Sequence, residues 1–218
     1  MKRKTFFKKI LSEEITPLEI YMRFLDDKNS YFFESVEGGE KWAKYSIIGL
    51  PTDKKIKLSD SPLDEIDDFM KSQKVERIEG LPDFTGGLVG YFSYDTIRHI
   101  EKKLSNSKKP QLNYAEISLM ISDELIVYDN YEKNLFIIVN DFEKNEKLAN
   151  SRIDEILQQI NTPLEDQENS KKNKIEFSSS VSKKDYLKNV KKIKDYILEG
   201  DVMQVVYGQE FSTNFEGS

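Results

Sequence analysis

Apolar residues recur along this chain with two periods, one helical and one extended. Leu63, Ile66, Phe69 and Met70 follow helical spacing and predict an amphipathic helix over 61–72. Further helices are expected over 16–27, 96–104, 146–160 and 182–199. Short apolar runs bounded by polar residues predict strands at 31–36, 44–50, 55–58, 86–95, 116–129 and 135–140.

Capping residues mark the start of the first helix. Thr16 supplies a hydroxyl cap, Pro17 occupies the first helical position, and Glu19 follows three residues after the cap. The acid lies near the positive end of the helix, where its charge is favourable. The stretch SPLDEI, which begins at residue 61, repeats this punctuation and supports the second helix.

The connections between strands indicate the fold class. Residues 130–134, NYEKN, separate two apolar runs and predict an antiparallel hairpin. Hairpins and interspersed helices are typical of a sheet without regular crossovers. We therefore expect an α+β fold with mainly antiparallel sheets flanked by helices.

A polar stretch divides the chain. Residues 162–180 lack periodicity over most of their length and have the composition of a linker. This predicts a first domain over 1–161 and a further segment over 181–218. In that segment Ser182 and Asp185 predict a capping box, and Gly200 predicts a left-handed helix terminus.

Lysines and apolar residues divide the predicted helix over 182–199 into two faces. Lys184, Lys188 and Lys191 are expected on a solvated face. The opposite face carries the apolar stripe that is expected to be buried, namely Leu187, Val190, Ile193 and Ile197.

Composition narrows the class of protein. The chain has 218 residues, 33% of them charged, and a formal charge of −6, so it carries no general nucleic-acid footprint. It contains no Cys, which excludes disulfides and thiolate metal sites. Its apolar runs are of strand length, so we expect no membrane span and a cytoplasmic location.

One polar pair follows an aromatic strand. Glu34 and Ser35 come directly after Phe33, and Gly38 and Gly39 supply a tight turn. A carboxylate and a hydroxyl at a strand end can hold a ligand's ammonium or amide group. They can equally cap the turn, and the residues alone leave both interpretations open.

The run GGLVGYFSYDTIRHIE, residues 86–101, is rich in glycine. It lacks the spacing of a dinucleotide fingerprint and the Lys of a phosphate loop, so close backbone packing in a sheet is the better explanation. Asp95, Arg98 and Glu101 follow helical spacing and are expected to pair structurally. His99 is the single histidine and is expected to be an ordinary helix residue rather than a metal ligand.

An amide interrupts the apolar stretch VMQVVY. Gln204 shares one strand face with Val202 and Val206, and the opposite face is also apolar, so we expect a strand buried on both sides. A buried amide needs hydrogen-bond partners. These partners can be neighbouring backbone groups, or the amide can serve a site.

Three stretches together resemble anthranilate synthase component I, a family of chorismate-utilising enzymes. The first is FFESVEGGEKWAKYSIIG, the second GGLVGYFSYDTIRHIE, and the third GDVMQVVYGQE. The resemblance covers residues 10–212 and corresponds to the N-terminal portion of that two-domain fold, with 181–218 as the start of the chorismate-binding domain. Phe32 and Phe33 replace a leucine pair, Gly208 replaces a serine, and Glu210 replaces an arginine.

The resemblance implies a feedback-inhibited lyase of tryptophan biosynthesis. It implies that Glu34, Ser35 and, more weakly, Lys44 contact L-tryptophan as effector. Gln204 matches a position where relatives that add water to chorismate have a lysine base; an amide cannot act as that base, which fits ammonia as nucleophile. The full-length family converts chorismate and ammonia to anthranilate and pyruvate and requires Mg²⁺, whose ligands are not in this chain.

The family's partner is a glutamine amidotransferase subunit, component II, which supplies ammonia. We expect this chain to be inactive alone, because the main catalytic residues of the family lie beyond Ser218. Two alternatives remain open. One is component I of aminodeoxychorismate synthase in folate synthesis, and the other is a catalytically inactive amino-acid-binding fragment.

Overall fold

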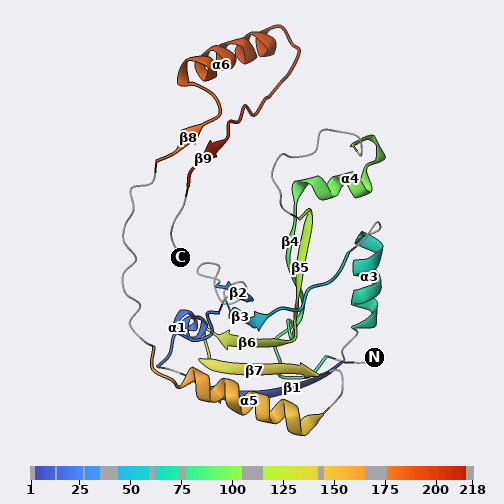
Figure 1. Ribbon diagram of the computed structural model, residues 1–218, viewed down its shortest axis with the longest axis vertical. Helices are drawn as coiled ribbons and strands as arrows, with labels where there is room; N and C mark the ends of the chain where they lie inside the picture. The colour runs from blue at the N-terminus through green and yellow to red at the C-terminus, as the bar shows by residue number, and fades with distance from the viewer. Residues whose placement is uncertain are drawn as a thin grey trace. The chain divides into compact units, whose positions relative to one another are not determined.

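The computed structural model describes residues 3–12, 14–26, 28–34, 44–58, 62–73, 77–104, 115–141, 145–164 and 176–214. They belong to two compact units, residues 1–164 and residues 165–218 (Figure 1). All strand pairs within the described residues are antiparallel. The α+β prediction is therefore confirmed.

A five-stranded sheet forms the centre of the first unit. Its spatial order is β1 (Lys4–Leu11), β7 (Asn134–Asp141), β6 (Glu124–Asp129), β3 (Tyr45–Thr52) and β2 (Asn29–Phe33). The hairpin predicted around 130–134 is confirmed by the pairing of β6 with β7. The strands with the longest apolar runs lie in the middle, where both edges are hydrogen-bonded.

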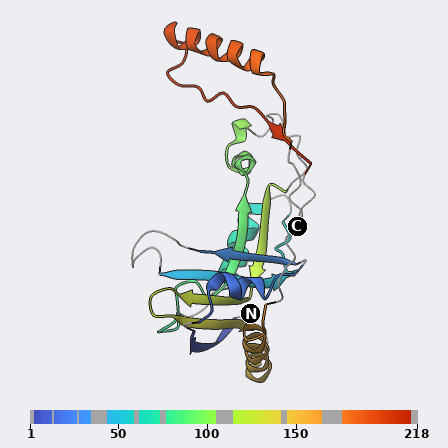
Figure 2. The same ribbon diagram turned by 90° about the vertical axis from the view of Figure 1, so that its left-hand side faces the viewer.

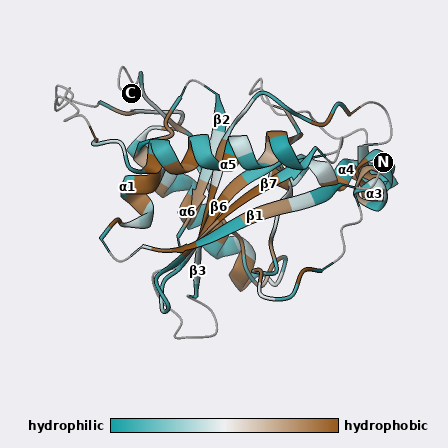
Figure 3. Ribbon diagram, turned by 90° about the horizontal axis from the view of Figure 1, so that it is seen from below, coloured by the Kyte–Doolittle hydropathy of each residue, from teal (hydrophilic) through white to brown (hydrophobic). Residues whose placement is uncertain are grey.

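Helix α5 (Glu146–Ile160) packs on one face of this sheet, and the short helix α1 (Pro17–Met22) lies beside it (Figure 3). Ala149, Ile153, Ile156 and Ile160 of α5 are buried at helical spacing. They meet the sheet residues whose side chains point to the same face, which include Ile48, Ile126, Tyr128, Leu135, Ile137 and Val139.

The opposite face of the central strands is also buried. Leu125, Val127, Phe136 and Ile138 form a smaller cluster there, and Phe84 packs against it. Both faces of β6 and β7 are therefore covered, which explains why their sequences are continuously apolar rather than alternating.

A second sheet, with β4 (Gly87–Phe92) and β5 (Ile117–Ser122), runs crosswise to the first (Figures 1 and 2). The single strand predicted over 116–129 is wrong, because the chain changes sheets at Asp123 between β5 and β6. The Asp123 carbonyl accepts hydrogen bonds from the backbone and side-chain N–H groups of Asn140, each at 2.9 Å. These long-range bonds turn the strand at a corner.

The remaining helices of this unit are short. Thr16 and Glu19 form the predicted capping box of α1, and α3 (Pro62–Ser72) confirms the second predicted helix. The helix expected over 96–104 is divided into η1 (Tyr94–Thr96), α4 (Ile97–Ile100) and η2 (Lys102–Leu104). Glu101, between α4 and η2, has extended backbone angles that interrupt the helix.

Tyr31 occupies space that only glycine leaves open. A Cβ at Gly49 would lie 1.8 Å from a carbon of the Tyr31 ring, so the ring lies directly over the backbone of β3. The hydroxyl groups of Tyr31 and Ser122 share a hydrogen bond of 2.8 Å. This bond links β2 of the first sheet to β5 of the second.

Burial raises the pKa of Tyr31 to about 12, against a small lowering by the bond to Ser122. Well below pH 10 the phenol is neutral in both the folded and the unfolded protein, so its full contribution to the free energy of unfolding is present there. Between pH 10 and 12 the unfolded phenol ionises first, and stability falls by about 3 kcal/mol. We expect Tyr31→Phe to remove this loss. Denaturant unfolding of both proteins at pH 9, 10, 11 and 12 checks it, and parallel curves would contradict it.

The second unit contains β8 (Ser178–Ser179), α6 (Lys183–Leu198) and β9 (Phe211–Ser212). The Ser182 hydroxyl accepts the Asp185 backbone N–H at 3.1 Å, and Gly200 has a φ of 83°, as the predicted helix ends require. Lys184, Lys188 and Lys191 are exposed, as predicted.

Two burial predictions for the second unit are wrong. The stripe on α6 is not buried, since Leu187 is 54% and Ile197 41% exposed. Residues 202–207 form no strand, and Met203 and Val206 are 98% and 89% exposed. An extended segment becomes a strand only when another strand pairs with it, and among the described residues β8 pairs only with β9.

Candidate functional site

The predicted effector residues lie at one end of the β2–β3 hairpin. Glu34 comes directly after β2, and Lys44 comes directly before β3. Because Phe33 pairs with Ile47, these two residues lie at the same end of the hairpin. Glu34 is exposed. Ser35 lies outside the described residues. The hairpin therefore brings an acidic and a basic side chain to one edge, and their contact with an effector stays a prediction.

Lys44 is tied to the turn between β6 and β7. Its Nζ lies 3.5 Å from Oδ2 of Asp129, and its carbonyl accepts the Asn130 N–H at 2.8 Å. Asp129 is 2% exposed, and its Oδ1 accepts the backbone N–H groups of Tyr131 and Glu132, each at 3.0 Å. The negative charge of Asp129 is the main cause of the raised pKa of Lys44, with Tyr45 as the next contribution.

The contact with Asp129 fixes the direction of the Lys44 ammonium but does not use all of its hydrogen-bond donors. An ammonium group has three N–H donors. With one directed at Asp129 and another at Tyr45, the third remains for a ligand carboxylate at this end of the hairpin. The sequence could not indicate Asp129 as the partner, because the two residues are joined only through the pairing of β3 with β6.

Gln204, the predicted catalytic-side residue, is exposed in the second unit. The prediction that it lies in a buried strand is wrong, because no strand among the described residues pairs with 202–207. Tyr207 nearby is held to α6, since its hydroxyl accepts from Nδ2 of Asn189 at 2.6 Å and its ring contacts that of Tyr186 in a tilted arrangement, with the ring centroids 5.0 Å apart. The segment is thus anchored at Tyr207, and the role of Gln204 stays a prediction.

The polar residues of the glycine-rich motif have structural roles. Nε of Arg98 donates to Oδ1 of Asp95 at 2.7 Å, as expected from their spacing. Nε2 of His99 lies 2.8 Å from Oε2 of Glu116. Across the described residues, no group of three or more His, Asp or Glu side chains gathers as metal ligands would.

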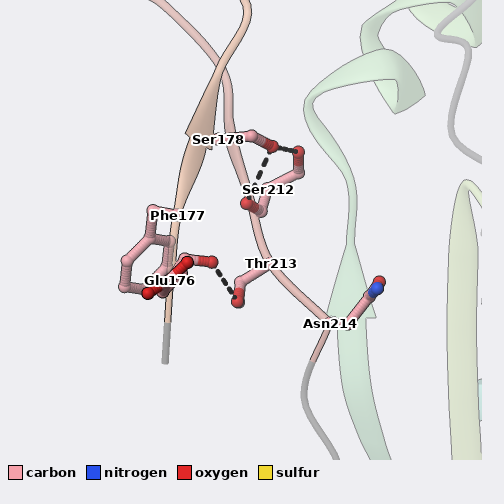
Figure 4. Close-up of a pocket in the computed structure, with 6 residues that line it drawn as sticks. All are labelled: Glu176, Phe177, Ser178, Ser212, Thr213 and Asn214. Carbon is pink, nitrogen blue, oxygen red and sulfur yellow. Dashed lines mark hydrogen bonds between the residues drawn. The ribbon is translucent and has the colours of Figure 1, made fainter. Parts of the chain in front are cut away.

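Sequence reasoning missed a hollow at the β8–β9 pair (Figure 4). It has a volume of about 310 Å³. Its hydroxyl groups are bonded to neighbours, since Ser178 and Ser212 share a bond of 2.8 Å and Thr213 donates to the Glu176 carbonyl at 2.8 Å. These hydrogen bonds join β8 to β9 and the residues beside them. The hydroxyl groups are therefore accounted for without a ligand.

Comparisons with known proteins bear on the whole chain. A family model described as chorismate binding enzyme matches residues 28–218. Anthranilate synthase component 1 of Pseudomonas aeruginosa is 36% identical over 239 residues, covering 95% of this chain and 48% of that protein. The protein of the same name from Acetivibrio thermocellus is 36% identical over 223 residues, covering 89% and 45%.

A solved structure has the same fold. It is anthranilate synthase component I from Streptococcus pneumoniae TIGR4, with a TM-score of 0.66 and 19% sequence identity, covering 96% of this chain and 49% of that one. The chain spans about half the length of the curated relatives it matches. Among its described helices, none is long and apolar enough to cross a membrane. Since the family model covers most of its length, the chain belongs to the family of chorismate binding enzymes.

Proposed function

We propose that this chain is the N-terminal portion of anthranilate synthase component I, whose whole protein converts chorismate and ammonia to anthranilate and pyruvate. The observation that carries the proposal is the 36% identity to relatives of that name along nearly the whole chain. The glutamine amidotransferase that supplies ammonia is proposed as partner on the same basis.

Gln204 is proposed to face the attacking ammonia. A side-chain amide has no lone pair basic enough to accept a proton from water near neutral pH. Ammonia already carries a lone pair and needs no base, so an amide carbonyl that accepts its N–H and orients it is sufficient. The described residues offer no ligand set for Mg²⁺. We propose, as the family resemblance implies, that the Mg²⁺ ligands of the whole protein lie outside this chain.

Feedback inhibition by L-tryptophan is proposed at the edge of the β2–β3 hairpin. Glu34 would accept from the ligand ammonium, with Ser35 beside it, and Lys44 would donate to the ligand carboxylate. The proposal is supported by the shared sheet edge of Glu34 and Lys44 and by the fixed direction of the Lys44 ammonium.

A chimera tests the proposed function. In it, this chain replaces the matching 48% of the P. aeruginosa relative. With chorismate, Mg²⁺ and ammonium, we expect anthranilate, identified by fluorescence and chromatography. Release of 4-amino-4-deoxychorismate instead would favour the folate enzyme, and the absence of any aminated product would reject both.

L-Tryptophan added to the same chimera tests the effector site. We expect Lys44→Met to weaken inhibition at least tenfold while leaving the rate without tryptophan within about twofold. Lys28→Met, at the opposite end of the hairpin, is the matched control and should retain full inhibition. Equal inhibition of all three proteins would reject the assignment of Lys44.

A further inference from the structure

A buried side-chain bond joins the β2–β3 hairpin to the second sheet. Tyr31 of β2 and Ser122 of β5 share the 2.8 Å hydrogen bond between their hydroxyl groups, and the two residues are 7% and 3% exposed. Breaking this bond would leave two buried polar groups without partners, which is costly. We therefore expect β2 and β5 to move together at this point.

The Tyr31 ring has little freedom to absorb a movement of β2. On one side it lies over the backbone of Gly49. Its centroid also lies 5.0 Å from that of the Phe33 ring, and Phe33 directly precedes Glu34. Close-packed side chains transmit a displacement to their neighbours. A movement at the Glu34 end of β2 would therefore reach the Tyr31 hydroxyl instead of being taken up by a rotation of the ring.

Ser122 passes such a movement to the glycine-rich motif. It is the last residue of β5 and pairs with Gly87, the first residue of β4. A Cβ at Gly86 would lie 2.5 Å from the Ser122 carbonyl oxygen, so the two chain segments are in close contact here. The motif GGLVGYFSYDTIRHIE thus begins at the point that the Tyr31 bond holds.

Backbone hydrogen bonds also join the two sheets. The N–H of Ile121 donates to the Lys54 carbonyl at 2.9 Å. This bond lies beyond the far end of β3, away from the proposed effector residues. Of these two connections, only the Tyr31 bond starts on the strand that leads into Glu34.

The second sheet leaves apolar surface exposed. Tyr91 and Phe92, at the end of β4, are 45% and 52% exposed. A two-stranded sheet is marginally stable unless other elements pack on it. This chain covers 48% of the P. aeruginosa relative, so a whole protein of that length has further residues that can pack there.

We propose that the Tyr31–Ser122 bond couples the effector end of the β2–β3 hairpin to the second sheet, which carries the effect of bound L-tryptophan to the other half of the whole protein. The proposal rests on the effector site proposed above. Both hydroxyl groups are buried, so the bond acts on the response to the effector and not on its binding. Its removal should leave tryptophan binding and the uninhibited rate in place and weaken the inhibition.

Tyr31→Phe and Ser122→Ala in the chimera test the coupling. Tyr31→Phe keeps the ring over Gly49 and removes only the hydroxyl. Calorimetry gives the Kd of tryptophan, and anthranilate fluorescence gives the residual rate at saturating tryptophan, relative to the uninhibited rate. We expect each variant to keep the Kd within about threefold and to raise the residual rate at least fivefold. The double variant should raise it no further, because both substitutions remove the same bond.

Tyr21→Phe is the matched control. The Tyr21 hydroxyl shares a bond of 3.2 Å with Ser30, also on β2, but Tyr21 belongs to α1 and not to the second sheet. Its residual rate should be unchanged. An unchanged residual rate in either Tyr31→Phe or Ser122→Ala would overturn the coupling, and so would an equal rise in the control. If tryptophan does not inhibit the unsubstituted chimera, the effector site itself is rejected and the coupling with it.

Discussion

The 218-residue chain by itself is expected to release no anthranilate from chorismate, Mg²⁺ and ammonium. Gln204 is exposed, and the segment that carries it has no paired strand on either side among the described residues. In open water an amide neither orients ammonia nor excludes solvent, so the contribution of a fixed geometry to the rate is lost. Fluorescence detection of anthranilate measures this directly.

The chimera with the P. aeruginosa half is the positive control for this expectation, and it should be active under the same conditions. Boiled protein sets the background rate. Sustained turnover by the isolated chain above that background would contradict the account, because it would require a complete site within these residues.

Gly90→Ala is expected to destabilise the protein by about 3 kcal/mol. A Cβ at Gly90 would lie 1.9 Å from the Ser118 carbonyl oxygen on the neighbouring strand β5. Because the clashing atom belongs to the backbone, the clash can be relieved only by moving β4 away from β5. Both the overpacking and the weakened pairing of the two strands then lower the stability. Denaturant unfolding gives the change in free energy, and hydrogen exchange shows whether the loss concentrates in β4 and β5.

Gly208→Ala is the matched control for this substitution. No atom lies within 4 Å of a Cβ at Gly208, so we expect a change within about 0.5 kcal/mol. If Gly90→Ala is as mild as the control, the close approach of β4 and β5 is not a constraint on the sequence, and the packing explanation for the glycine-rich run fails.

Local sequence signals predicted the elements whose causes are local. The capping box at Thr16 and Glu19 acts within one turn, and both of its hydrogen bonds are present, at 2.8 and 3.2 Å. The hairpin over 130–134 likewise depends on neighbouring residues. The break at Asp123 coincides with three polar residues, Ser122, Asp123 and Glu124, but this short interruption did not indicate a change of sheet, because the bonds that turn the chain come from the distant Asn140.

In the candidate site, too, the features with local causes were predicted and those that depend on distant contacts were not. Strand pairing alone places Glu34 and Lys44 at one edge, which the sequence pattern anticipates. The partner of Lys44, Asp129, and the hydrogen bond between Tyr31 and Ser122 arise from contacts between distant strands. For α6, periodicity indicated which face is apolar. It could not indicate whether another segment of this chain packs against that face.

The central claim is that residues 202–207, which form no strand in this chain, become one when they are joined to the other half of an anthranilate synthase component I. Hydrogen exchange of these amides, compared between the isolated chain and the chimera, tests it most directly. We predict exchange within seconds in the isolated chain and at least a hundredfold slower exchange in the chimera. Equal rates in the two proteins, whether both fast or both slow, would contradict the claim.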